Sequence, residues 1–187
     1  MSLRARLLLA TGLLVVLGAC ETSKQGFPEV SNPTTDSEES IGRLDSPSHL
    51  VAEVSEGKVQ YSVSREQLIK NFTRQFNDGT VVDKALVRKV QGNAKEKPVY
   101  YLVGLGLRNG RFRAMAMPLQ LSTDNSLYLT SAAERYVIES SGCQFCFFNF
   151  EGSQIVGTSC EESGGGASCD LSVQQNNTFF PTSNSRK

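Results

Sequence analysis

Residues 100–117 read YYLVGLGLRNGRFRAMAM, and this stretch has the pattern of a β-hairpin. Two apolar runs flank Asn109-Gly110, a dipeptide that suits the positive φ angles of a type I′ turn. A two-residue turn at this point places Leu107 opposite Phe112 on the two strands. The sequence therefore predicts two long antiparallel strands joined at Asn109-Gly110.

The two faces of this hairpin differ in chemistry. We expect the face that carries Leu107 and Phe112 to be the core, because apolar residues alternate along it. The other face presents Arg108, Arg111 and Arg113. Guanidinium groups pair bidentately with anions, so these arginines are a candidate binding site for an acidic sugar, a phosphate or a lipid head group. The alternative is that they keep the hairpin tip soluble and free of edge-to-edge aggregation.

The chain before the hairpin contains a strand pattern followed by a helix pattern. Apolar residues alternate with polar ones over residues 59–63, which predicts a strand. Ser64 and Gln67 form a capping box, and large apolar residues then recur at i, i+4 and i+8 over residues 68–76. Asn77-Asp78-Gly79 supplies a stop signal. We expect a helix between Ser64 and Asn77.

The remaining patterns after the helix favour strands. Residues 80–90 are rich in β-forming residues, residues 119–121 extend the hairpin, and residues 127–129 follow a turn at Asp124-Asn125. This order predicts an α+β fold in which one helix packs on an antiparallel β-meander. We expect the C-terminal part of the domain to be rich in loops and held by disulfides.

Four cysteines lie in this C-terminal part: Cys143, Cys146, Cys160 and Cys169. In an exported chain an even number of cysteines indicates disulfide bonds, here two bonds with three connectivities open. We favour bonds in which each member of the first pair reaches one member of the second.

Two other chemistries remain open for these cysteines. A four-thiolate metal or iron–sulfur site would use the C-x-x-C at Cys143 and Cys146, but the spacing of Cys160 and Cys169 is wider than usual. A thiol–disulfide redox enzyme would use the same C-x-x-C, although no βαβ pattern surrounds it. We expect no metal and no cofactor.

The first twenty residues have the pattern of an export signal. Arg4 and Arg6 precede an apolar run that is too short for a bilayer span and that ends in small residues. Leu17-Gly18-Ala19-Cys20 resembles the lipobox of bacterial lipoproteins. The resemblance implies cleavage before Cys20, diacylglycerol on its sulfur and a further acyl chain, such as palmitate, on its new amino group. Glu21, in place of aspartate, favours the outer membrane of a Gram-negative bacterium.

Composition divides the chain into four parts. Residues 1–19 are the expected signal peptide, and residues 20–48 are polar and acidic, which is typical of a disordered tether. Residues 49–175 are the expected single globular domain, and residues 176–187 are expected to be a flexible tail.

Patterns typical of catalysis are missing from the sequence. His49 is the only histidine of the chain and lies at the edge of the tether, so a serine or cysteine nucleophile has no well-placed base. The formal net charge is zero, yet residues 58–113 carry twelve bases and four acids. We expect no nucleic acid partner, because the chain is exported, but an anionic envelope ligand remains open.

These features predict a membrane-anchored envelope lipoprotein with a non-catalytic binding or structural role. Its expected partners are the membrane, through lipidated Cys20, and either another envelope protein or an anionic envelope ligand. The alternatives are a thiol–disulfide redox enzyme that uses Cys143 and Cys146, and a metal-binding protein that uses all four cysteines of the domain.

Overall fold

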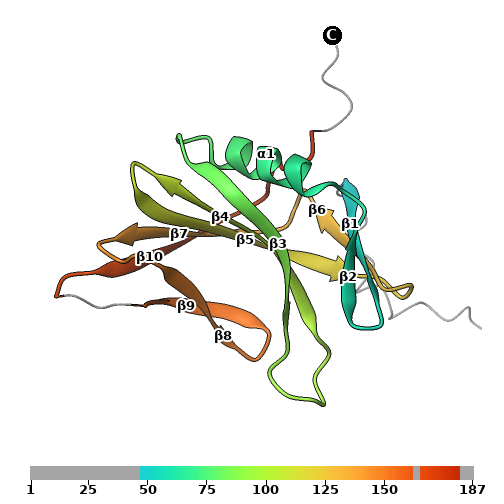
Figure 1. Ribbon diagram of the computed structural model, residues 1–187. Helices are drawn as coiled ribbons and strands as arrows, with labels where there is room; N and C mark the ends of the chain where they lie inside the picture. The colour runs from blue at the N-terminus through green and yellow to red at the C-terminus, as the bar shows by residue number, and fades with distance from the viewer. Residues whose placement is uncertain (1–46, 162–164, 182–187) are drawn as a thin grey trace, which may run out of the picture. The chain divides into compact units, whose positions relative to one another are not determined.

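The computed structural model describes residues 47–161 and 165–181, which form ten strands and one helix (Figure 1). The elements in chain order are β1 (Ser48–Ser55), β2 (Lys58–Tyr61), α1 (Arg65–Phe76), β3 (Val81–Val90), β4 (Val99–Arg108), β5 (Arg111–Leu121), β6 (Ser126–Thr130), β7 (Arg135–Ser141), β8 (Cys146–Glu151), β9 (Gln154–Cys160) and β10 (Ser168–Gln174). The predicted signal peptide, the lipobox with Cys20 and nearly all of the predicted tether lie outside the described residues.

Eight of the strands form one sheet that divides at β5. Strands β3, β4 and β5 pair in sequence order, all antiparallel. Beyond β5, Arg113–Ala116 pair with β7, which leads to β10, whereas Gln120–Leu121 pair with β6, which leads to β1 and β2. Pro118 lies between these two segments and has no N–H to donate to a neighbouring strand, which explains why the sheet divides there.

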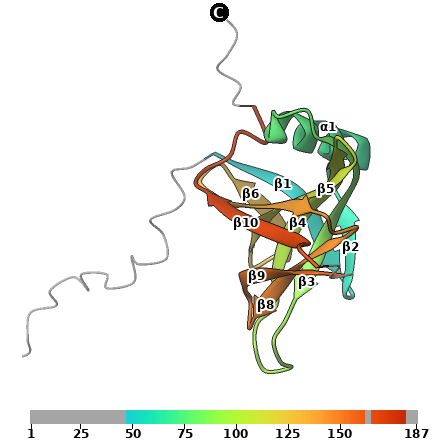
Figure 2. The same cartoon turned by 90° about the vertical axis from the view of Figure 1, so that its left-hand side faces the viewer.

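The predicted fold class is wrong. The protein is mostly β, and its sheet curves into a nearly closed, barrel-like form, so it is not a helix packed on a meander. The predicted loop-rich C-terminal part contains β7, β8, β9 and β10, and β8 and β9 make a separate two-stranded sheet beside β10 (Figure 2). The error arose because β5 pairs with a strand distant in sequence, and hydrophobic periodicity reports only on neighbours along the chain.

The local elements near the hairpin are confirmed. Ser64 caps α1 by accepting a hydrogen bond from the Gln67 N–H at 3.2 Å, and Asn77 ends the helix in the left-handed conformation. Asn109 and Gly110 both have positive φ angles, and Leu107 lies opposite Phe112 as the type I′ turn requires. The register of the hairpin therefore follows from its turn.

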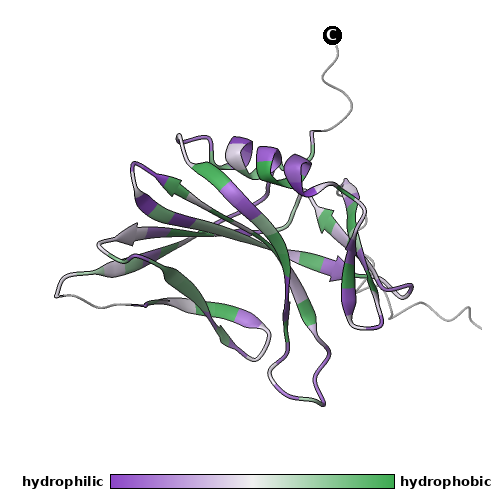
Figure 3. Ribbon diagram, viewed as in Figure 1, coloured by the Kyte–Doolittle hydropathy of each residue, from purple (hydrophilic) through white to green (hydrophobic). Residues whose placement is uncertain are grey.

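Apolar side chains are buried on both faces of the β4–β5 hairpin. One cluster, which includes Leu102 and Met115, packs under α1, and a second, which includes Val103 and Phe112, packs against the β8–β9 hairpin. Figures 1 and 2 show α1 and the β8–β9 hairpin on opposite sides of the sheet, and Figure 3 shows hydrophobic residues on that hairpin. The face that we expected to be exposed, with its arginines, is therefore covered by the helix at its centre.

Residues 175–181, which we call the segment after β10, pack against the domain, although we expected a flexible tail from residue 176 onward; residues 182–187 of the expected tail lie outside the described residues. Phe179 is fully buried and contacts the Phe72 ring edge to face, with 4.7 Å between the ring centroids. Asn177 is also buried, and its side-chain amide donates to the carbonyls of Thr130 and Ala133. No helix within residues 47–161 and 165–181 is both long and apolar enough to span a bilayer.

Candidate functional site

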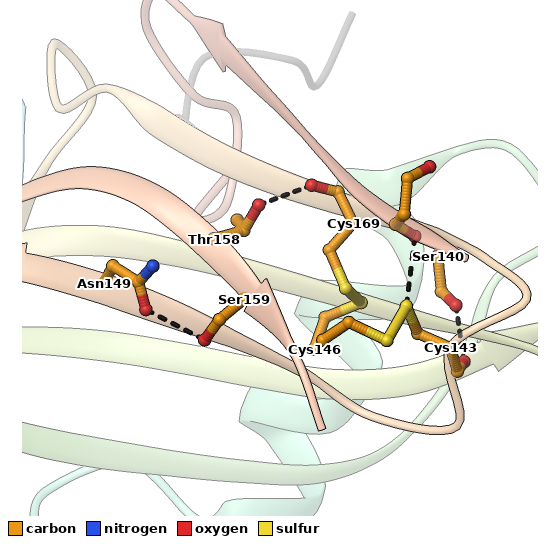
Figure 4. Close-up of a disulfide and its surroundings, with 9 residues drawn as sticks. Ser140, Cys143, Cys146, Asn149, Thr158, Ser159 and Cys169 are labelled. Atoms are coloured by element: carbon orange, nitrogen blue, oxygen red, sulfur yellow. Dashed lines mark hydrogen bonds between the residues drawn. A yellow bond between two sulfur atoms is a disulfide. The ribbon is translucent and has the colours of Figure 1, made fainter. Parts of the chain in front are cut away.

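The four cysteines of the domain are paired in the structure. Cys143 is bonded to Cys160 and Cys146 to Cys169, which confirms the predicted disulfides and the pattern that joins each member of the first pair to one of the second (Figure 4). The second bond joins the start of β8 to β10, and the first joins the loop before β8 to the end of β9. Together they fasten the β8–β9 hairpin to the rest of the domain.

The two disulfides lie next to each other. The Sγ atoms of Cys143, Cys146 and Cys169 all lie within 4.8 Å of one another. In thiolate form such a cluster could hold a metal ion, but a sulfur in a disulfide has no thiolate to offer. Cys143 and Cys146 are also buried, at 6% and 5% exposure, which protects them from reaction partners. The arrangement is that of a structural cross-link.

An apolar cleft opens beside the Cys143–Cys160 bond. It has a volume of about 450 Å³ and lies between the tip of the β4–β5 hairpin and the loop that carries Cys143 and Phe145. Phe112 forms one wall of the cleft and packs edge to face on the Phe145 ring, with 5.6 Å between the ring centroids. We refer to this pocket as the apolar cleft; its main apolar residues are Leu105, Leu107, Phe112 and Phe145.

The mouth of the apolar cleft exposes large apolar side chains to solvent. Leu107 is 51% exposed and Phe145 is 45% exposed. Val81, which lies opposite Leu107 in the β3–β4 register, is 67% exposed. Asp83 and Lys84 stand at the rim with opposite charges. An exposed patch of this kind with a polar rim is typical of a binding surface.

The apolar cleft has no clear signature in the sequence. The alternation in the hairpin predicted that Leu107 would be buried in the core, and it offered no role for Phe145. Leu107 lies next to the turn of the hairpin, at the mouth of the apolar cleft, and is half exposed there. The C-x-x-C motif was the available signal, because Phe145 stands between its two cysteines.

The structure separates the three hairpin arginines: Arg108 and Arg111 line a small open pocket together with Asn109 and Glu139, whereas Arg113 is buried. The Arg113 side chain is 8% exposed, donates to Asp78 Oδ2 at 2.7 Å and also pairs with Glu139. Arg108 lies 3.5 Å from the same Asp78 oxygen. Arg111 forms no ion pair with any other described residue. Because two carboxylates neutralise Arg113, its guanidinium is not available to an anionic ligand.

Asp78 is stabilised in its charged form. Burial raises the pKa of its carboxyl, but hydrogen bonds from the Thr80 hydroxyl and N–H, at 2.6 and 3.0 Å, together with the charges of Arg113 and Arg108, lower it further than burial raises it. The net pKa therefore lies below the ordinary value of 3.8. This carboxylate joins the end of α1 to the hairpin.

Two tyrosines, one on β4 and one on β7, act as hydrogen-bond donors. The Tyr136 hydroxyl donates to Glu134 Oε2 at 2.8 Å, and burial together with this carboxylate raises the pKa of Tyr136 to about 12. The Tyr101 hydroxyl donates to the Ser153 carbonyl at 2.9 Å, and burial raises its pKa as well. Both phenols stay protonated at neutral pH, so neither is suited to act as a base.

His49 lies far in the fold from the cysteines. It belongs to β1, on the other branch of the sheet, and its ring contacts the Phe180 ring at 4.6 Å between centroids. The structure therefore brings no histidine of the described residues to the disulfides or to the apolar cleft.

Comparison of the chain with protein-family models, curated proteins and solved structures finds no match.

Proposed function

We propose that this protein is an exported, lipid-anchored binding protein of the bacterial cell envelope. The observation that carries the proposal is the use of its five cysteines. Four of them pair in two disulfides, a chemistry of oxidising compartments outside the cytosol. The fifth, Cys20, stands in Leu17-Gly18-Ala19-Cys20, where the lipobox resemblance requires a cysteine for acylation. Two or three acyl chains then hold the chain on a membrane, because each buried methylene contributes about 0.8 kcal/mol.

A binding role, rather than catalysis, is supported by what the reactive groups already do. The domain cysteines are bonded to one another, Arg113 is held between two carboxylates, and the Tyr136 phenol donates to Glu134. Each of these groups is committed to holding the fold. The apolar cleft, by contrast, leaves the large side chains of Leu107 and Phe145 about half exposed to solvent.

The occupant that we propose for the apolar cleft is an apolar side chain of another envelope protein. A volume of about 450 Å³ suits one or two large side chains, and aromatic walls that exclude water are typical of the centres of protein interfaces. The rim carries one acid and one base, Asp83 and Lys84, so it favours a partner with mixed charge over a polyanion. The tether would present the domain to such a partner above the membrane surface.

The anchor is tested by replacing Cys20. We expect the wild-type chain to sediment with membranes and to have a mass that includes a diacylglycerol group. The Cys20→Ser variant should lack this added mass, because it has no thiol to acylate. It should therefore not be processed to a lipidated mature chain. Density-gradient separation of inner and outer membranes then tests the proposed outer-membrane location. A wild-type chain without added lipid mass would contradict the anchor.

The apolar cleft is tested by photo-crosslinking in intact cells. A benzophenone-bearing amino acid at position 107 should form a discrete protein adduct, whereas the same amino acid at position 173 should not. Val173 is a matched control, because it is 50% exposed and Leu107 is 51% exposed. Phe145→Ser should abolish the adduct from position 107. Equal adducts from both positions, or an adduct that consists of lipid alone, would contradict a protein partner at the apolar cleft.

A thiol–disulfide enzyme is the second candidate, and the proximity of the Cys143, Cys146 and Cys169 sulfurs favours it. If the cysteines are structural, protein isolated without reductant should be four hydrogen atoms lighter than the all-thiol form, two for each bond. A stable population with free Cys143 and Cys146 thiols would favour the enzyme, and bound metal would favour the four-cysteine metal protein.

A further inference from the structure

A second pocket lies at the C-terminal end of α1, on the other side of the sheet from the apolar cleft. It has a volume of about 660 Å³ and is formed by the last turn of the helix, the start of β7 and the segment after β10. All but one of its lining residues are polar: Arg74, Gln75, Asn77, Arg135, Gln175, Asn176, Asn177 and Thr178. We refer to it as the arginine pocket.

The charge of the arginine pocket is one-sided. Arg74 and Arg135 both line it, and none of the described residues that line it is acidic. Neither guanidinium forms an ion pair with the described part of the chain. The neighbouring acid Glu134 accepts hydrogen bonds from the Gln175 side chain and the Tyr136 hydroxyl, but does not line the pocket. Two like charges that face one cavity without an acid attract an anion.

Both arginines are held in place by main-chain carbonyls. Arg135 donates from Nε to the Asn176 carbonyl at 2.8 Å. Arg74 donates from Nη2 to the Phe179 carbonyl at 2.8 Å and to Asn71 Oδ1 at 3.1 Å. These bonds use part of each guanidinium, which carries five N–H donors in all. Burial lowers the pKa of Arg135, and no carboxylate offsets this effect. The side chains are thus fixed while donors remain for a ligand.

We propose that the arginine pocket binds a small anionic ligand in which a carboxylate or phosphate is joined to a hydroxyl-rich body, such as a sugar acid or a sugar phosphate. The guanidinium groups of Arg74 and Arg135 hold the oxyanion. The side-chain amides of Asn77, Gln175 and Asn176 and the hydroxyl of Thr178 supply donors and acceptors for hydroxyl groups. The volume exceeds the need of a bare ion and falls within the usual range of ligand pockets, about 300–1,000 Å³.

Titration of the isotope-labelled domain by NMR tests this proposal, with four separate probes: inorganic phosphate, glucuronic acid, glucose 6-phosphate and uncharged glucose. We expect saturable shifts of the Arg135 Nε–H and the Asn176 and Thr178 amides with the two anionic sugars. Glucose should give none, and phosphate should bind more weakly than glucose 6-phosphate. Equal binding of phosphate and both sugars would reduce the site to one for bare oxyanions and overturn the sugar class. No saturable shift with any anionic probe would overturn the site.

Arg135→Gln is the decisive variant, because glutamine still offers a donor to the Asn176 carbonyl while the charge is lost. We expect its affinity for glucose 6-phosphate to fall by about tenfold or more, the usual effect of losing a charged hydrogen bond. Arg65→Gln makes the same change of charge at an exposed arginine that lies outside the pocket and forms no ion pair with other described residues, and it should leave the affinity unchanged. An equal loss in both variants would mean that net charge, and not the pocket, binds the anion. Should Arg135→Gln fail to fold, the chemical shift of the wild-type Arg135 Nε–H decides the question.

Discussion

At the scale of single residues, Gly104 sets how closely α1 approaches the sheet. A Cβ atom at this position would lie 2.5 Å from the Phe72 ring, well inside van der Waals contact. Phe72 is fully buried and is itself held by Phe179, so its ring has little room to move. The helix therefore packs directly against bare backbone of β4.

The first prediction is that Gly104→Ala destabilises the domain. Overpacking of this kind costs about 1–3 kcal/mol of unfolding free energy, measured by urea denaturation. Gly157→Ala is the matched control, because Gly157 is also in a strand and a Cβ there would have nothing within 4 Å. The control should stay within about 0.5 kcal/mol of the wild type. Equal stability of the two variants would contradict the close packing of Phe72 on Gly104.

The carboxylate of Asp78 predicts a dependence of stability on pH. Because its folded-state pKa is lowered, its contribution is fully present above the ordinary value of 3.8 and is lost as the pH falls through the lower folded-state value. Asp78→Asn should reduce the unfolding free energy by about 1–3 kcal/mol at pH 7, since charged hydrogen bonds are lost. The difference from the wild type should shrink below pH 3.8.

The control for Asp78 is Asp83→Asn. Asp83 is exposed and forms no ion pair with other described residues. The unfolding free energy of this variant should therefore equal that of the wild type both at neutral pH and at acidic pH. A difference between Asp78→Asn and the wild type that is the same at pH 7 and at pH 3 would show that the charge of Asp78 has no part in its effect.

At the scale of elements, the segment after β10 closes one end of the domain. It is neither a helix nor a strand, yet its main chain and side chains form hydrogen bonds with α1 and with the end of β6 and the residues that follow it. The Gln75 side chain of α1 accepts from the Thr178 N–H at 2.8 Å, and Arg74 donates to the Phe179 carbonyl. The polar composition of this segment led us to expect a tail, because two aromatic residues in a polar run give no periodic signal.

The corresponding prediction concerns Phe179. Phe179→Ala removes a fully buried ring from its contact with Phe72 and should cost about 3–5 kcal/mol of unfolding free energy. Phe147→Ala is the same substitution at a ring that is 46% exposed, and it should cost less than about 1 kcal/mol. Thermal and urea denaturation of both variants measure the difference. Similar costs would contradict the docking of the segment.

At the scale of the whole molecule, the curved sheet has a cluster of apolar residues on each face, and the two clusters are covered in different ways. Helix α1 and the segment after β10 cover one cluster, which is continuous with β1 and β6. The β8–β9 hairpin covers the other, and the disulfides fasten this hairpin to β10 and to the loop before β8. The apolar cleft opens where this second cover ends.

We predict that loss of one disulfide loosens the β8–β9 side first. The double variant Cys146→Ala, Cys169→Ala should lose about 2–4 kcal/mol of unfolding free energy, since the bond restricts the unfolded chain. Hydrogen exchange should become faster in β8 and β9 while α1 and β3 keep their protection. Faster exchange in all elements to the same degree would mean that the two faces of the sheet unfold as one unit.

Features that depend on near neighbours along the chain could be predicted from the sequence. The turn at Asn109-Gly110 set the hairpin register, Ser64 and Asn77 set the limits of α1, and the even number of domain cysteines indicated two disulfides. Each of these depends on residues a few positions apart or on the chemistry of one residue type.

Which charges are free and which apolar residues are exposed depends on contacts that form only when the chain folds. Arg113 looked available in the sequence, yet Asp78, 35 residues away, neutralises it. Arg135 had no signal, yet it meets Arg74 at a pocket that the segment after β10 completes. The division of the sheet at β5 likewise needed partners distant along the chain. The physical reason is that burial and pairing come from contacts between distant segments, whereas sequence patterns report the preferences of each segment separately.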